Sequence, residues 1–290
     1  MMRTARLWVI VGMLAGPAAA SPRLPELQSR SAVVIDAASG DELYAKQADS
    51  VRPIASTTKI FVALVVRAHG IDLDGWTEIT RADAYAARGG SRTRLGVGER
   101  FTNRDLLRAM LMASDNRAPT ALARAAGLDA DQLVVEMNEV AKRLGLAHTR
   151  FTDPNGLRGN VSTARELALA LHAALADDVL RSIMGDDFQI VVAKGGHTRI
   201  EYTSTNQPLV AKKWDVIGGK TGYTDAAGYC YITEARIDGR ELLMAFMHAD
   251  DKLARFTDFD RVATWLDRGG MPPAAKPHAA QGQARVASDD

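Results

Sequence analysis

The sequence predicts an α+β (α/β) domain in which strands from both ends of the chain form one sheet. Strand-like segments lie at 31–46 and at 199–249, whereas the region between them is rich in Ala and Leu and has the pattern of helices. We therefore expect two N-terminal and three C-terminal strands in one five-stranded antiparallel sheet, flanked by helices. A helical insert at about 70–190 is expected beside it.

The composition is that of an ordinary globular protein. The chain has 290 residues, of which 47% are hydrophobic and 24% charged. Lys plus Arg is 36 and Asp plus Glu is 35, so the net charge does not indicate nucleic acid as a partner. Because Cys230 is the single cysteine, no intrachain disulfide can form, and we expect it to be a small buried side chain in a packed core.

The two ends of the chain are expected to lie outside the catalytic domain, which we place at 21–270. Residues 1–20 combine a basic start, the apolar run LWVIVGMLAG and the small residues PAAA, which is the plan of a signal peptide cleaved after Ala20. The alternative is an uncleaved membrane anchor, and in either case the protein is exported and periplasmic. Residues 271–290 are expected to be disordered, and they offer no apolar face to a membrane, so peripheral membrane contact is the most we expect.

The N-terminal third predicts a hairpin and a buried helix. SAVVID (31–36) and ELYAK (42–46) flank AASGD, which is a turn sequence. From Ser56 to His69 the apolar residues are dense, and Gly70 closes the stretch, so a buried helix is expected there.

The middle of the chain predicts several helices. Thr102, with Asp105 three residues later, is a capping signal before an apolar run. Further helices are expected at 117–126, 129–144 and 163–175, and FTDPNGL (151–157) is a turn-rich loop.

The C-terminal third returns to strands. RIEYTST (199–205) alternates between apolar and polar residues, and GYCYITEAR and ELLMAFMHA are joined through Asp238-Gly239, a strong hairpin signal. RFTDFDRVATWLDRG (255–269) predicts an amphipathic closing helix.

The first chemical signal is the pair Ser56 and Lys59. A serine at a helix start is ordinarily an N-cap, but Lys59 lies one turn further on the same face of a helix that should be buried. A buried lysine is costly and its pKa falls, so it can serve as general base to a neighbouring serine nucleophile. The N–H groups of the helix N-terminus suit a developing oxyanion.

Two further triplets strengthen this interpretation. Ser114-Asp115-Asn116 lies between two predicted helices, and Lys220-Thr221-Gly222 occupies a strand-like position before the final hairpin. Each triplet alone has an ordinary structural explanation as a cap or a turn. All three motifs in this order are roughly a 0.1% coincidence for this composition.

This motif set is that of penicillin-binding proteins and serine β-lactamases. Three longer stretches, SRTRLGVGERFTNRDLLRAMLMASDNRAP, FTDPNGLRGNVSTARELA and KKWDVIGGKTGYTDAAGYC, resemble the low-molecular-mass D-alanyl-D-alanine carboxypeptidases and endopeptidases of peptidase family S11. The likeness is greatest to the penicillin-binding protein 7 type of endopeptidase, and it covers roughly residues 30–268. It implies the DD-peptidase/β-lactamase-like fold and a penicillin-sensitive serine DD-peptidase that acts on peptidoglycan.

The resemblance implies a role for each motif residue in the chemical step. Ser56 would attack the carbonyl between two D-alanines, or the equivalent bond of a cross-link, and form an acyl-enzyme. Lys59 would accept the serine proton. Ser114 would relay a proton to the leaving amine, and Asn116 would hold the amide of the substrate.

The remaining motif residues would bind the substrate. Lys220 would supply positive charge and Thr221 a hydroxyl, while Gly222 would let the substrate lie along the strand. The backbone N–H groups of Ser56 and Tyr223 would form the oxyanion hole. The expected partners are peptidoglycan stem peptides and, as covalent inhibitors, β-lactam antibiotics; no cofactor, metal or nucleic acid is expected.

Two other classes of protein are alternatives to a DD-peptidase. A serine β-lactamase needs a group that speeds deacylation, and the candidate, Glu166, is expected to be an exposed helix residue. A non-catalytic wall-binding or β-lactam-sensing protein on the same scaffold is a second alternative. None of the six histidines forms a His-Glu-x-x-His pattern, and a Ser-His-Asp triad is not excluded by spacing.

Overall fold

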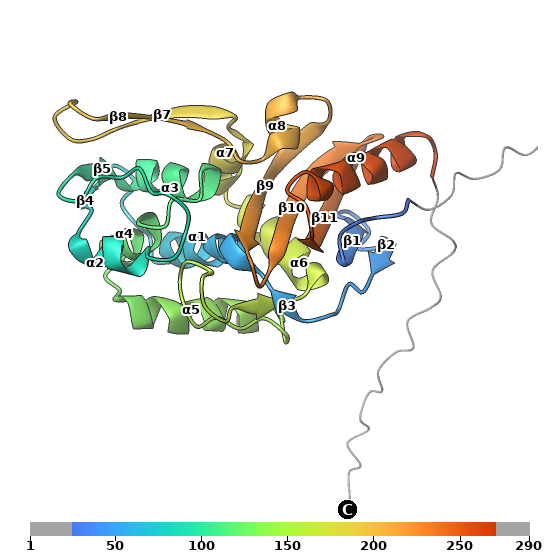
Figure 1. Cartoon of the computed structure of the whole chain (residues 1–290), viewed down its shortest axis with the longest axis horizontal. Coiled ribbons are helices and arrows are strands. Elements are labelled where there is room, and N and C mark those ends of the chain that lie inside the picture. Colours follow the sequence, from blue (N-terminus) through green and yellow to red (C-terminus); the bar gives the residue numbers. More distant parts are fainter. Residues whose placement is uncertain (1–24, 271–290) are drawn as a thin grey trace, which may run out of the picture.

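The computed structural model describes residues 25–270 of the chain, so the predicted signal peptide and C-terminal tail lie outside the described residues. Its centre is a five-stranded antiparallel sheet with strand order β2-β1-β11-β10-β9 (Figure 1). The predicted α+β fold is confirmed. The strands are β1 (Ser31–Asp36), β2 (Glu42–Lys46), β9 (Asp215–Thr224), β10 (Gly228–Ile237) and β11 (Arg240–Ala249).

The sheet joins the two ends of the described chain. The N-terminal strand β1 pairs with the last strand β11, in register from Ser31 opposite Met247 to Asp36 opposite Leu242. The predicted hairpin between β10 and β11 is also confirmed, with φ of 48° at Asp238 and 73° at Gly239. Positive φ at both central residues is what a type I′ turn requires, and this turn matches the twist of the strands.

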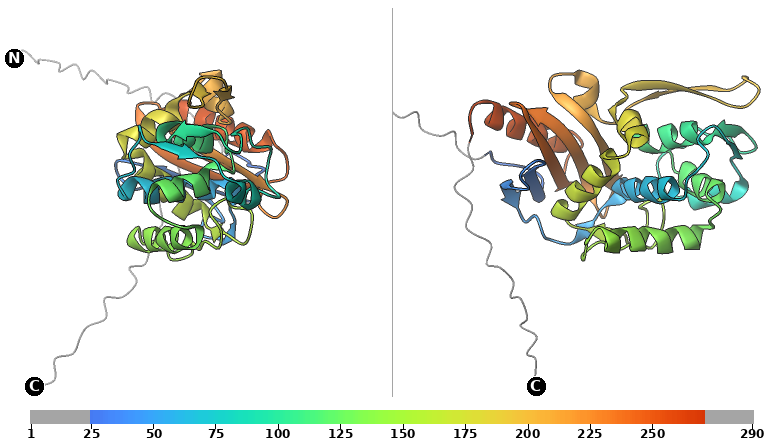
Figure 2. Two further views of the ribbon diagram at one scale, coloured as in Figure 1. Left: turned by 90° about the vertical axis from the view of Figure 1, so that its left-hand side faces the viewer. Right: turned by 180° about the vertical axis from the view of Figure 1, so that it is seen from behind.

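Helices cover both faces of the sheet. The closing helix α9 (Ala254–Asp267) packs on one face, and α6 (Ala164–Leu175) packs on the other (Figure 2). Strand β1 contributes to both cores, because Ala32 and Val34 belong to the α9 side whereas Val33 and Ile35 face α6. This is the period-two alternation of a strand that is buried on both faces.

A helical lobe lies beside β9, the edge strand (Figure 1). Its first helix is the buried α1 (Lys59–Ala68), which contacts α5 and α6. The predicted cap before α3 is confirmed, because the Thr102 hydroxyl accepts a hydrogen bond of 3.1 Å from Asp105 N. The remaining helices are α2 (Arg81–Ala86), α3 (Asn103–Met112), α4 (Ala118–Ala125), α5 (Ala130–Arg143), α7 (Asp178–Gly185) and α8 (Gln207–Ala211).

Three short strand pairs complete the described fold. They are β3 (Arg52–Pro53) with β6 (Val161–Ser162), β4 (Trp76–Glu78) with β5 (Arg100–Thr102), and β7 (Phe188–Val192) with β8 (Arg199–Thr203). The alternating segment at 199–205 is thus a strand, but it pairs with β7 and packs on α3, away from the main sheet. The fifth strand of the main sheet is β9, which carries Lys220-Thr221-Gly222. Among residues 25–270, no helix is long and apolar enough to cross a membrane.

Candidate active site

Ser56 lies in a tight turn and does not cap a helix through its side chain. It belongs to the 3-10 turn η1 (Ala55–Thr58), which precedes α1 and has no side-chain cap. Ala55 has a φ of 48°, in the left-handed region. The turn is packed so closely that a Cβ at Gly156 would lie 1.9 Å from the Ala55 carbonyl oxygen. Ser56 therefore directly follows a residue in a sparsely populated backbone conformation, as is common at active sites.

Lys59 is the first residue of α1 and its side chain is fully buried. Its Nζ lies 2.9 Å from Ser56 Oγ, 2.6 Å from Asn116 Oδ1 and 3.0 Å from the carbonyl oxygen of Asn155. Burial lowers the pKa of Lys59 to about 7, and this effect is partly offset by the negative charges of Asp115 and Asp153.

These three contacts orient the neutral form of Lys59 toward Ser56. Asn116 Oδ1 and the Asn155 carbonyl can only accept hydrogen bonds, so they take the two protons of a neutral amine. The nitrogen lone pair then faces the Ser56 hydroxyl, 2.9 Å away. A lysine with a pKa near 7 in this position is a general base for a serine nucleophile.

The Ser114-Asp115-Asn116 segment follows α3 and is fixed by its buried aspartate. The Asp115 carboxylate accepts hydrogen bonds from the backbone N–H groups of Arg94 (2.7 Å) and Arg117 (2.9 Å). Ser114 has a φ of 62°, and its buried Oγ has no hydrogen-bond partner among the described residues. An unpartnered buried hydroxyl is costly, so it has a hydrogen bond available for a ligand.

The second lysine of the motif set is also buried. Lys220 Nζ donates a hydrogen bond of 2.8 Å to the Thr221 carbonyl. Burial lowers the pKa of Lys220 well below its ordinary value, and the nearby positive charges of Lys59 and Arg255 lower it further. A ligand with negative charge would relieve this repulsion between cations.

Gly222 lets β9 approach the Ser56 turn. A Cβ at this position would lie 3.0 Å from Ser56 N and 3.0 Å from the Ile54 carbonyl oxygen. A glycine is the residue that fits such a close contact between two backbone segments. The close approach places the Ser56 backbone N–H beside the strand along which a peptide could lie.

The three motifs meet at one cleft between the sheet and the helical lobe. The cleft has a volume of about 820 Å³, and it is lined by Ser56, Ser114, Asn116, Thr221, Gly222 and Tyr223. The side-chain amino groups of Lys59 and Lys220 are buried, and Lys59 reaches the cleft residues Ser56 and Asn116 through its hydrogen bonds. All eight residues predicted from the sequence are thus brought together.

Three residues near the site were not among the predicted site residues, although Asn155 lies in the FTDPNGL stretch that carries part of the family resemblance. Asn155 acts through its backbone carbonyl, and Thr205 reaches the cleft from the loop before α8. Arg255, from α9, donates hydrogen bonds to the carbonyls of Gly222 (2.8 Å) and Cys230 (3.0 Å), so it ties β9 and β10 to the closing helix.

Cys230 is buried as expected, and burial raises its pKa to about 11.

The loop FTDPNGL holds the Asn155 carbonyl in place. One carboxylate oxygen of Asp153 accepts the backbone N–H groups of Asn155 (2.8 Å) and Gly156 (2.9 Å), and the other accepts that of Arg158 (2.8 Å). Asn160 Nδ2 donates to Thr58 Oγ1 at 3.0 Å, which links the loop to the serine turn. Besides forming a turn, the loop therefore helps to position the general base, Lys59.

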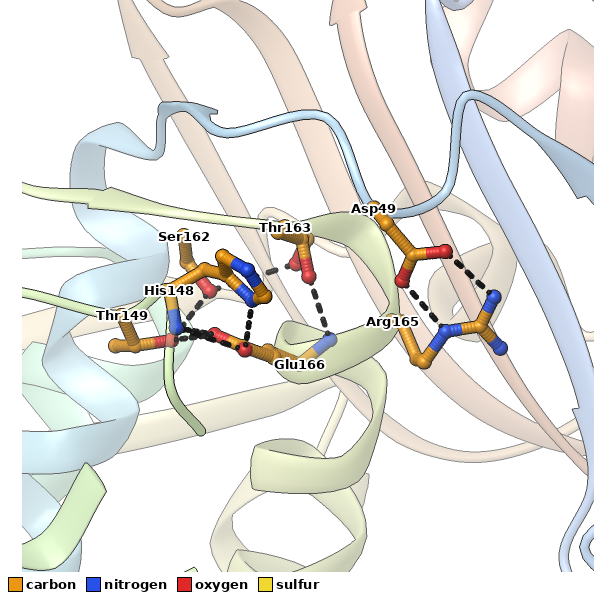
Figure 3. Close-up of polar contacts among 7 residues, drawn as sticks. All are labelled: Asp49, His148, Thr149, Ser162, Thr163, Arg165 and Glu166. Carbon is orange, nitrogen blue, oxygen red and sulfur yellow. Dashed lines mark hydrogen bonds and ion pairs between the residues drawn. The ribbon is translucent and has the colours of Figure 1, made fainter. Parts of the chain in front are cut away.

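Glu166 is not the exposed helix residue that the sequence suggested. It is 7% exposed, and its carboxylate accepts hydrogen bonds from His148 N (2.9 Å) and Thr149 Oγ1 (2.6 Å), as Figure 3 shows. His148 Nδ1 lies 2.9 Å from the same carboxylate, and Thr163 caps the helix at Glu166 N. His148 and Thr149 therefore cover the side chain. Glu166 does not line the cleft, so its role is structural.

The site contains a serine that a lysine can activate, and it lies beside the edge strand of an antiparallel sheet. This arrangement defines an enzyme that catalyses acyl transfer through a serine and whose site suits an extended peptide. Comparison with known proteins identifies the family. The Peptidase S11 family, described as D-alanyl-D-alanine carboxypeptidase, matches residues 18–251. The chain belongs to this family of serine D-Ala-D-Ala peptidases.

Characterised relatives include both endopeptidases and carboxypeptidases. The chain is 34% identical to the D-alanyl-D-alanine endopeptidase of Pseudomonas aeruginosa, with 91% of this chain and 86% of the relative covered. It is 31% identical to the endopeptidase of Escherichia coli, with 93% and 88% covered. It is 33% identical to a D-alanyl-D-alanine carboxypeptidase of Mycobacterium tuberculosis, with 87% and 86% covered.

Solved structures show the same fold. The Streptomyces K15 DD-transpeptidase superposes with a TM-score of 0.77 at 27% identity, covering 84% of this chain and 98% of that chain. A penicillin-binding protein homologue of Mycobacterium tuberculosis gives a TM-score of 0.77 at 30% identity, covering 89% and 97%. The DD-peptidase fold predicted from the motifs is confirmed.

Proposed function

We propose that this DD-peptidase cleaves cross-links of peptidoglycan through an acyl-enzyme on Ser56, in preference to trimming terminal D-alanine. The observation that carries the mechanism is the contact of 2.9 Å between Ser56 Oγ and a buried Lys59 whose pKa is about 7. The preference for cross-links is supported by the relatives named as endopeptidases, which are similar over most of the chain.

In the acylation step, Ser56 Oγ attacks the carbonyl carbon of the scissile amide while its proton passes to Lys59 Nζ. The C–N bond of the tetrahedral intermediate then breaks, and the leaving amine receives the proton held by Lys59, relayed through the hydroxyl of Ser114, so that Lys59 is neutral again. In the second step a water molecule attacks the ester and gives a proton to Lys59, which returns it to the Ser56 oxygen as that oxygen leaves. The unpartnered Oγ of Ser114 supports this relay.

The substrate would bind at the edge of β9. A stem peptide would lie along Gly222 as an added strand, with its carbonyl oxygen between the N–H groups of Ser56 and Tyr223. The Nδ2 group of Asn116 would hold the substrate amide, since its Oδ1 is used by Lys59. Lys220 would supply positive charge, and Thr221 a hydroxyl, on the leaving-group side. β-Lactams would acylate Ser56 in the same way.

The N-terminal sequence is the basis for proposing a periplasmic location. The basic start, apolar run and small residues of 1–20 support export by a signal peptide, and the substrate lies in the periplasm.

The preference is tested by mass spectrometry of purified muropeptides. We expect the enzyme to convert cross-linked dimers to monomers with a higher kcat/KM than it trims monomeric pentapeptides, since discrimination reflects differential binding of transition states. Ser56→Ala is the control and should convert neither substrate. If pentapeptides lose D-alanine at least as fast as dimers disappear, the preference for cross-links is wrong and the broader DD-peptidase activity remains.

A further inference from the structure

A loop of the helical lobe forms part of the wall of the cleft. It follows α2 and runs over residues 87–93. Its cleft-lining residues are Gly89, Gly90, Ser91 and Arg92. The loop packs directly on the second catalytic motif, since a Cβ at Gly90 would lie 2.2 Å from Asn116 Nδ2. It therefore lies where the substrate amide is held.

Both ends of this loop are fixed to residues of the active site. At its start, Asn155 Nδ2 donates a hydrogen bond of 3.1 Å to the carbonyl of Ala86. At its end, Arg94 N donates a hydrogen bond of 2.7 Å to the carboxylate of Asp115. The backbone of Arg92 is held between these two anchors, so its position relative to the catalytic residues is set by the site itself.

Arg92 is the arginine of this loop whose guanidinium is free to bind a ligand. The guanidinium of Arg88 lies 4.8 Å from the centre of the Tyr85 ring, and that of Arg94 lies 5.2 Å from the centre of the Tyr202 ring. Arg92 is exposed, and it makes no hydrogen bond, ion pair or ring contact within residues 25–270. It thus offers an uncompensated positive charge to the cleft.

The loop lies on the side of the cleft that would receive the acyl part of the substrate. The leaving group is placed beside Lys220 and Thr221, so the acyl part runs the other way along β9, past Gly222. Asn116, which would hold an amide of this part, is the residue that Gly90 contacts. Arg92 is therefore next to the stem residues that precede the scissile bond.

The other charges that line the cleft leave Arg92 as the group that suits an anion on this side. Asp225, from the turn after β9, is exposed and accepts a hydrogen bond of 2.8 Å from the Tyr223 hydroxyl. Its negative charge would repel a carboxylate from the sheet side of the cleft. Arg255 is buried, and its guanidinium donates to two carbonyls of the sheet.

We infer that Arg92 is a specificity-determining residue that binds a carboxylate on the acyl part of the stem peptide. A guanidinium matches a carboxylate with two parallel hydrogen bonds, which an amide cannot accept in the same way. Two sources offer such a group: the α-carboxyl of a γ-linked glutamate, and the side-chain carboxyl of a diaminodicarboxylic third residue. The inference rests on the proposed DD-peptidase function and adds a preference on the acyl side, separate from the choice of leaving group.

Three cross-linked dimers test the inference. They share one leaving half and differ only in the donor stem, which has both carboxylates free, the glutamate α-carboxyl amidated, or the carboxyl of the third residue amidated. Mass spectrometry gives kcat/KM for each dimer. For the wild type we expect a fall of about fivefold on amidation of the carboxylate that Arg92 binds, the upper range for one ion pair at a partly exposed site. In Arg92→Gln the three values should be alike.

Arg88→Gln is the matched control, because it removes the same charge from the same loop but outside the cleft lining, and it should keep the wild-type ratios. Covalent labelling by a fluorescent penicillin checks that each variant is folded. Equal values for all three dimers in the wild type, unchanged ratios in Arg92→Gln, or the same loss of selectivity in Arg88→Gln would each overturn the inference.

The test also separates this inference from the proposed function. If no dimer is cleaved, the proposed function is wrong and the inference falls with it. If all dimers are cleaved equally well, the inference alone is wrong, because the preference for cross-links is measured against monomeric pentapeptides.

Discussion

The carbonyl oxygen of Asn155 accepts a hydrogen bond of 3.0 Å from Nζ of Lys59. A loop that lies far from the serine motif in the sequence thus helps to orient the general base. The loop in turn depends on Asp153, whose carboxylate gathers its backbone N–H groups and whose charge raises the pKa of Lys59 against the effect of burial. Its effect on the base is therefore both geometric and electrostatic.

Asp153→Asn should change acylation in two measurable ways. Loss of the negative charge should move the pH midpoint of the acylation rate to a lower pH, because the charged form of Lys59 loses a favourable interaction. Loosening of the loop should also lower the plateau rate by about ten- to a hundredfold, the usual cost of a misplaced catalytic group. Stopped-flow acylation by a fluorescent penicillin gives both values. Asp74→Asn, at a side chain that is 90% exposed, is the control and should change neither.

The acylation rate of the wild type should rise with pH and reach half its plateau near pH 7. Lys59 accepts the serine proton only in its neutral form, and burial brings its pKa to about 7. Lys59→Arg should be inactive over the whole range, since arginine stays protonated in proteins. A flat pH profile, or near-normal acylation by Lys59→Arg, would leave Lys59 with an electrostatic role alone.

Glu166→Gln should lower stability without changing the lifetime of the acyl-enzyme. The amide loses one acceptor for the donors of His148 and Thr149, at a cost of about 1–3 kcal/mol. A fall in Tm together with an unchanged release rate of bound penicillin is the expected result. A slower release in this variant would instead support the β-lactamase alternative, in which a glutamate activates water.

The sequence predicts those residues of the site whose type and position in the sequence indicate a role. Lys59 stands out because a lysine at the start of an apolar helix needs an explanation, and the glycine of Lys-Thr-Gly is explained by close packing. The contribution of Asn155 is a backbone carbonyl, which every residue has, so no residue type marks it. Arg255 and Thr205 act across the fold, and their sequence neighbours give no sign of their contacts.

Periodicity reveals a buried face but not what covers it. The alternation at 199–205 correctly predicts a strand, β8, yet the same pattern fits the main sheet and the separate hairpin with β7 equally well. The exposure predicted for Glu166 is wrong for the same reason, because the residues that cover its side chain, His148 and Thr149, are distant in sequence.

The pairing of β1 with β11 has a consequence for how the enzyme comes to be active. β1 is an interior strand of the sheet and the first strand of the described chain, and its partner β11, the central strand, is the last one to be synthesised. Arg255, which fastens the Lys-Thr-Gly strand, comes later still. Contacts between such distant segments form late in folding, after the entropy of closing a long loop has been lost. Ser56 is therefore synthesised early, but its active site is assembled only at the end of folding. A chain that stops before the closing helix would contain every catalytic motif but would lack an assembled active site.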